Sequence, residues 1–182
     1  NYYHTGGGAG VAARAGKLYQ SDGYDAAGTL LTRRYSNWIE GSAFSTPWVY
    51  LQDSTTTTKG SGNTPDVSSG TAYQYRTDHQ GGNQFGLQTD VSTYANGGLV
   101  RRSETWYIQD MVNGAFFFRP IQSQTFDGGT TCTGTTRFGY DNQAYGVAPN
   151  SAGNTTDVWV ATTCPATVTT PLDSTWLRTQ MA

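Results

Sequence analysis

An Asn-Gly pair at positions 113 and 114 constrains the fold of this chain more than any other feature. A two-residue type I′ turn needs positive φ angles at both central residues, and Asn followed by Gly tolerates them best. The stretch 96–120 therefore predicts a β-hairpin, and its first strand, Leu99–Met111, follows a second turn signal at 96–98. Such a turn would pair Val112 with Ala115, Met111 with Phe116 and Asp110 with Phe117.

The two faces of this hairpin are both largely apolar near the turn, which predicts strands covered on both sides or one face exposed for binding. Pro120 cannot donate a hydrogen bond to a ladder, so the second strand is predicted to lie at an edge or to bend there. One face is expected to carry Trp106, Ile108, Asp110 and Val112 opposite Phe117, Arg119 and Ile121.

The composition extends the β prediction to the whole chain. Gly accounts for 23 of the 182 residues, and there are 12 Tyr and 5 Trp, but Lys and Glu occur only twice each. Charged helix formers are thus scarce, while β-branched, aromatic and turn residues abound. Turn signals recur about every 8–12 residues without an internal repeat, as in all-β domains. We therefore predict an antiparallel β-sandwich, jelly-roll-like, with one disulfide.

The chain divides into a Gly-rich arm at residues 1–16 and a single sandwich domain at 17–182. A short helix is weakly indicated at Val11–Tyr19, and the tail at Leu172–Ala182 is predicted to be helical or extended. The polar stretch Asp53–Gly70 is predicted to be a long loop. Alternating patterns predict further strands at Thr29–Ile39, Thr46–Gln52, Thr71–Arg76, Phe85–Tyr94, Thr135–Tyr140 and Asp157–Thr163.

Charge and hydropathy exclude some partners. The formal net charge is −2, and the two arginine doublets, 33–34 and 101–102, would each point to opposite faces of a strand. Nucleic acid is therefore not expected as a partner. No apolar run reaches about 18 residues, so no membrane span is predicted. Because the chain begins at Asn1 without Met, we expect a processed form or a segment of a longer chain.

The only two cysteines are Cys132 and Cys164. An even count in a chain rich in Thr, Ser, Asn and Gly predicts a disulfide and a secreted, extracellular or virion-surface location. The alternative is two free buried thiols. Two Cys and two distant His are too few for a zinc site, so neither a metal nor another cofactor is expected. Asn154 begins an Asn-Thr-Thr sequon, which matters only in a glycosylating host.

Aromatic and amide side chains together give the richest functional signal. Tyr and Trp offer flat apolar rings with polar tips, which suit the C–H faces of sugars, while amides and carboxylates bind hydroxyls. Most aromatic residues in a sandwich pack in the core or across strands, so we expect at least half of the candidates to be structural. The ligand-binding candidates are Trp48, Tyr50, Tyr73, Tyr75, Trp106, Tyr107 and Asp110.

Glu40 and Glu104 are the only glutamate pair, and two carboxylates about 5–9 Å apart are what a glycoside hydrolase needs. The alternative is structural: Glu40 would be a solvated turn carboxylate, and Glu104 would pair with a cross-strand Arg. We expect no catalytic residues. His4 and His79 lie far apart in the sequence, and no Gly-x-Ser-x-Gly nucleophile elbow accompanies them.

Three functions remain open. The first is an extracellular or virion surface subunit of a fibre, pilus or phage tail, used for attachment, with glycan recognition as an added role. Its arm would add to a neighbour's sheet edge, giving self-association. The second is a monomeric carbohydrate-binding module or lectin. The third is a small jelly-roll glycoside hydrolase. Deleting residues 1–16 tests the first, and Glu104→Gln tests the third.

Overall fold

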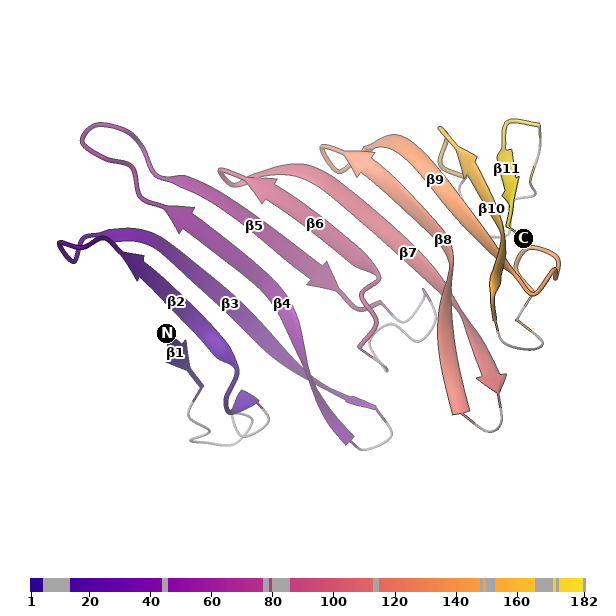
Figure 1. The fold of residues 1–182 in the computed structure, drawn as a ribbon, viewed down its shortest axis with the longest axis horizontal. Helices are drawn as coiled ribbons and strands as arrows, with labels where there is room; N and C mark the ends of the chain where they lie inside the picture. Colours follow the sequence, from indigo (N-terminus) through magenta and orange to yellow (C-terminus); the bar gives the residue numbers. More distant parts are fainter. Residues whose placement is uncertain are drawn as a thin grey trace.

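A computed structural model shows an all-β chain (Figure 1). It describes residues 1–4, 14–43, 46–76, 79, 86–112, 115–147, 149, 153–165, 172 and 174–181. At 42–43, 46–48, 110–112 and 115–117 it describes the backbone alone. Within these ranges the strands are β1 Tyr2–Tyr3, β2 Leu18–Tyr24, β3 Leu30–Ala43, β4 Thr46–Thr58, β5 Val67–Gln74, β6 Asp90–Ala95, β7 Gly98–Val112, β8 Ala115–Asp127, β9 Thr131–Tyr140, β10 Thr155–Ala161 and β11 Leu177–Gln180.

The strands form one antiparallel sheet in which each strand pairs with its neighbours in the chain. Figure 1 shows the sheet as one twisted layer that runs from β1 at the left to β11 at the right. The predicted all-β, antiparallel class is confirmed. The jelly-roll-like sandwich is not confirmed and stays a prediction, because the described strands show only this sequential pairing. No helix in the described ranges is long and apolar enough to cross a membrane.

The hairpin of β7 and β8 has the predicted register next to its turn, with Val112 opposite Ala115. The turn residues, 113 and 114, lie outside the described residues. Farther along, the prediction was wrong by one residue, because Trp106 lies opposite Gln122 rather than Ile121. The register shifts beside Pro120, which cannot donate to the ladder, and a β-bulge accommodates the extra residue.

The polar stretch Asp53–Gly70 is mostly strand, so the loop predicted there was wrong. β4 continues to Thr58, β5 begins at Val67, and residues 59–66 alone connect them. The physical reason is the run of four Thr after Ser54: β-branched side chains favour the extended backbone even without an apolar pattern. The helix weakly indicated at Val11–Tyr19 is also contradicted in part, because its last two residues begin β2 and 11–13 lie outside the described residues.

One face of the sheet, here called the buried face, is covered over β8–β10. The chain between β9 and β10 places Tyr145 edge-on against Trp159, with ring centroids 6.0 Å apart. The chain before β11 places the ring of Trp176 against the guanidinium of Arg137, and the Arg137 Cζ lies 4.5 Å from the ring centroid. We call these two segments the cover. The side chains beneath it are mostly polar, because the cover supplies aromatic rings and backbone oxygens for them. They include Gln122, Gln124, Thr135, Arg137 and Trp159.

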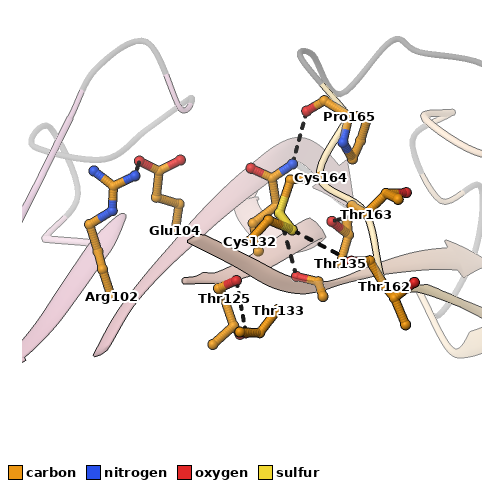
Figure 2. The surroundings of a disulfide bond; sticks show 12 residues. Arg102, Glu104, Thr125, Cys132, Thr133, Thr135, Thr162, Thr163, Cys164 and Pro165 are labelled. Carbon is orange, nitrogen blue, oxygen red and sulfur yellow. Dashed lines mark hydrogen bonds and ion pairs between the residues drawn. A yellow bond between two sulfur atoms is a disulfide. The ribbon is translucent and has the colours of Figure 1, made fainter. Parts of the chain in front are cut away.

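The predicted disulfide between Cys132 and Cys164 is confirmed, and neither cysteine is a free thiol (Figure 2). It fastens the chain that leaves β10 onto β9. Beside it, the Thr135 hydroxyl donates a hydrogen bond to the Thr163 carbonyl at 2.7 Å, as Figure 2 shows. The Gln124 amide donates to the Pro165 carbonyl at 3.0 Å. The disulfide and these bonds hold the start of the cover in place.

Asp22 and Arg33 make the stability of the sheet pH-dependent. Arg33 donates from Nε and Nη2 to the two Asp22 oxygens at 2.8 Å each, and the carboxylate side chain is 2% exposed. This pairing lowers the pKa of Asp22 to about 2. Because the unfolded pKa is about 3.9, the stabilisation is complete above that value and is lost as the pH falls toward 2.

We expect Asp22→Asn to flatten the acid limb of the stability profile. Urea unfolding between about pH 5 and pH 2 should show a steep loss for the natural chain and a shallower one for the variant. Asp127→Asn, at the exposed end of β8, is the matched control and should keep the natural slope. Identical slopes for the natural chain and Asp22→Asn would contradict the assignment.

Candidate functional site

A hollow of about 320 Å³ lies over β3, β4 and the end of β5, and we call it the tyrosine hollow. Its size is at the lower end of the range for small-ligand sites, about 300–1,000 Å³. It brings together three of the predicted ligand-binding residues, Tyr50, Tyr73 and Tyr75. The full lining is Ile39, Glu40, Gly41, Tyr50, Gln52, Tyr73, Gln74, Tyr75 and Arg76.

Tyr50 forms the floor of the tyrosine hollow and is structural. Its side chain is 6% exposed, and its ring stacks on Tyr75 with centroids 4.7 Å apart. Two glycines hold the other parts of the ring. A Cβ at Gly86 would lie 2.7 Å from Tyr50 Cε1, and a Cβ at Gly41 would collide with Cε2 of the same ring. The ring therefore fills space that any side chain at these glycines would occupy.

Tyr73 and Tyr75 differ in what they leave open to a ligand. The Tyr75 hydroxyl donates a hydrogen bond to the Leu51 carbonyl at 2.7 Å, and one face of its ring is taken by Tyr50. Burial raises the pKa of Tyr75 above the ordinary value of tyrosine, which already lies well above neutral pH, so the hydroxyl remains a donor. Tyr73 is half-buried, and among the described residues its ring stacks on no other ring. Tyr73 is thus the ring best placed to contact a ligand.

Polar side chains surround these rings. Gln52 and Gln74 are exposed and offer amide donors and acceptors. Glu40 is exposed as well, and its carboxylate accepts a hydrogen bond from Arg14 Nε at 3.1 Å. The Arg76 side chain is part-exposed and adds a cation to the lining. The hollow therefore combines flat rings with hydrogen-bonding groups of both kinds.

Behind Arg76 lies a buried charged cluster. Asp90 in β6 is directly opposite Glu104 in β7, and two like charges so placed repel each other. Arg76 Nη1 lies 3.8 Å from Asp90 Oδ1 and 3.9 Å from Glu104 Oε1. Arg102 Nη2 lies 3.1 Å from the same Glu104 oxygen, as Figure 2 shows. The positive charges of the two arginines offset the repulsion between the carboxylates.

Glu104 pairs with an arginine, but the cross-strand position predicted for that partner was wrong, because the nearest arginine, Arg102, lies on the same strand. Glu40 differs from the prediction, because it lies within β3 and binds Arg14 rather than ending a strand as a solvated turn residue. Among the described residues, no group of three or more His, Cys, Asp and Glu is arranged to hold a metal ion.

Among the described side chains, Trp106 and Tyr107 do not line the hollow. Trp106 stacks on the buried ring of His79, with centroids 4.4 Å apart and planes at 17°. The Tyr107 hydroxyl donates to the Gln88 carbonyl at 2.8 Å. The side chains of Trp48 and Asp110 lie outside the described residues, although their backbones belong to β4 and β7.

Sequence reasoning missed Gln52, Gln74 and Arg76 as members of the site. In the stretch 71–76, TAYQYR, the polar residues Gln74 and Arg76 alternate with the two tyrosines, and this pattern pointed away from a shared site. The alternation predicts that the tyrosines and the polar residues point to opposite faces. The chain leaves β5 after Gln74, however, and the regular alternation no longer holds for the residues that follow.

No protein-family model, curated protein or solved structure matches this chain.

Proposed function

We propose that this protein acts in attachment at an extracellular surface and binds a carbohydrate in the tyrosine hollow. The observation that carries the proposal is the grouping of Tyr73 with two exposed amides, Gln52 and Gln74, in one hollow. A tyrosine ring packs against the C–H face of a sugar, while amides bind its hydroxyl groups. The disulfide supports an oxidising, extracellular setting.

The polarity of the hollow favours a sugar over an apolar ligand. Glu40 and Arg76 each lie in its lining and are already engaged by charged partners, Arg14 and the buried carboxylates. They therefore offer directional hydrogen bonds to a neutral sugar without a large unbalanced charge. A subunit of a fibre, pilus or phage tail would carry such a hollow as its attachment site.

We expect Tyr73→Ala to weaken glycan binding about tenfold, which corresponds to about 1.4 kcal/mol. A glycan array probed with the natural chain identifies the ligand, and calorimetry then compares the variants. Tyr35→Ala is the matched control, because Tyr35 is an exposed tyrosine of β3 outside the hollow. Equal loss in both variants, or no glycan bound by the natural chain, would refute sugar binding at this hollow.

The same glycan separates attachment from hydrolysis. Glu40 lines the hollow, and Glu104 touches Arg76, which lines it too. If the natural chain releases reducing ends from the bound glycan and Glu104→Gln abolishes that release, the protein is a glycoside hydrolase. If the glycan stays intact and Glu104→Gln still binds it, the attachment role stands.

A further inference from the structure

The strand β11 leaves one edge of the sheet open. Among the described strands it pairs with β10 alone (Figure 1). All four of its residues are exposed. Natural edge strands are usually short, or blunted by Lys, Pro or bulges. β1, at the other edge, has only two residues and an irregular register. β11 is also short, with four residues, but it has neither Lys nor Pro, and its register with β10 is regular.

The direction of the free backbone groups follows from one hydrogen bond. Met181 N, just after β11, donates to the Thr156 carbonyl of the neighbouring chain segment at 2.8 Å. In an antiparallel pair, alternate residues direct both of their backbone groups toward the same neighbour. Leu177 and Thr179 therefore bond to β10 as Met181 does. Arg178 and Gln180 direct their N–H and C=O groups away from the sheet.

The topology determines which partner strand continues the antiparallel pattern. Eleven strands that alternate in direction leave β1 and β11 running the same way. A copy that added its β1 to β11 with the same face of the sheet upward would form a parallel junction in an otherwise antiparallel sheet. A copy related by a two-fold axis would add its own β11 antiparallel, with the same face of the sheet upward.

We propose that two copies of this chain pair through β11 about a two-fold axis at Thr179. In this register Arg178 lies opposite the partner's Gln180, and the outward N–H and C=O groups of these residues form four hydrogen bonds across the junction. Thr179 lies opposite the partner's Thr179, and these two residues form the non-hydrogen-bonded pair between the two bonded pairs.

The side chains fit this register. Leu177 and Met181 share one face of the strand and are 78% and 47% exposed. In the dimer, Leu177 of each copy would lie opposite the partner's Met181, and the two side chains would cover each other. The one charged residue, Arg178, binds Asp157 of its own chain, with Nη2 near Oδ1 at 2.6 Å. Its charge is therefore neutralised before the copies meet. This inference does not depend on the proposed sugar binding.

Light scattering after gel filtration tests the pairing. We expect the natural chain to show a molar mass twice the 19.6 kDa of one chain, rising toward that value with concentration. Gln180→Pro removes one outward N–H and no donor that faces β10, so it should shift the protein to the monomer. Gln180→Ala keeps the N–H and should remain dimeric. A monomeric natural chain, or a dimeric Gln180→Pro protein, overturns the proposal.

A second experiment tests the register and does not rely on proline. Cα atoms in a non-hydrogen-bonded antiparallel pair, such as the two copies of Thr179, lie about 4.5 Å apart, within the range that a disulfide spans. Thr179→Cys should therefore form a covalent dimer under mild oxidation, seen on a non-reducing gel. Leu177→Cys faces the partner's Met181 and should not. Equal cross-linking of the two variants, or none in Thr179→Cys, rules out this two-fold axis.

Discussion

Replacing Cys132 and Cys164 together with Ala is expected to lower the free energy of unfolding by about 4 kcal/mol. The bond joins residues 32 apart in the sequence, and the estimate follows from the loop-closure entropy that the cross-link removes from the unfolded chain. Such a loss is a large part of the 5–15 kcal/mol by which domains are usually stable. Urea unfolding of the natural chain and the double variant, both in the absence of reductant, measures it.

The same substitution should loosen the cover of the buried face before the sheet unfolds. Without the disulfide, the chain after β10 is held near β9 mainly by the bonds from Thr135 and Gln124. Amide exchange should therefore rise first in β11, which follows this segment. Thr135→Val is the matched control: it removes one hydrogen bond and should cost about 1 kcal/mol. A double cysteine variant no less stable than this control would contradict the prediction.

Arg137→Ala is expected to destabilise the protein by about 3–5 kcal/mol, as truncation of a large buried side chain does. The side chain is 0% exposed. Its guanidinium lies between Tyr145 and Trp176, 4.5 Å from each ring centroid, and Nε donates to Gln122 Oε1 at 2.7 Å. Truncation would open a cavity between the rings and leave the Gln122 oxygen without its main donor.

A double-mutant cycle separates the packing of Arg137 from its hydrogen bond. Arg137→Met keeps an unbranched stem between the rings, so it should lose less stability than Arg137→Ala. Adding Gln122→Met removes the stranded partner and should recover part of the remaining loss. Urea unfolding of the single and double variants gives the coupling energy. A loss below about 1 kcal/mol for Arg137→Ala would show that the cover contributes little.

Strand content and local pairing could be predicted from the sequence because they depend on neighbouring residues. The Asn-Gly turn and the alternation beside it predict the pairing of Val112 with Ala115, which the structure confirms. The error began at Pro120, which predicted an edge or a bend in the strand but not the insertion of one extra residue there. The run of Thr after Ser54 misled in another way: its polarity suggested a loop, but its β-branched side chains form a strand.

The candidate site was predicted only in part. The pairing of aromatic and amide residues pointed to Tyr50, Tyr73 and Tyr75, and these do meet in one hollow. It could not show that Tyr50 packs between glycines, since Gly86 is far from it in the sequence. It also could not show that Trp106 stacks on His79.

The sequence by itself determined that the chain is all-β, where its central hairpin turns, and that its two cysteines pair. These features follow from residue type and short spacing, which act within one turn, one strand or one pair of identical side chains. Only the tertiary structure decided which tyrosines share a hollow, that Arg137 is buried under a cover, and that β11 lies at an open edge. Those features depend on contacts between residues distant in the sequence and on the exact register of paired strands, where one bulge moves every later side chain relative to its neighbours.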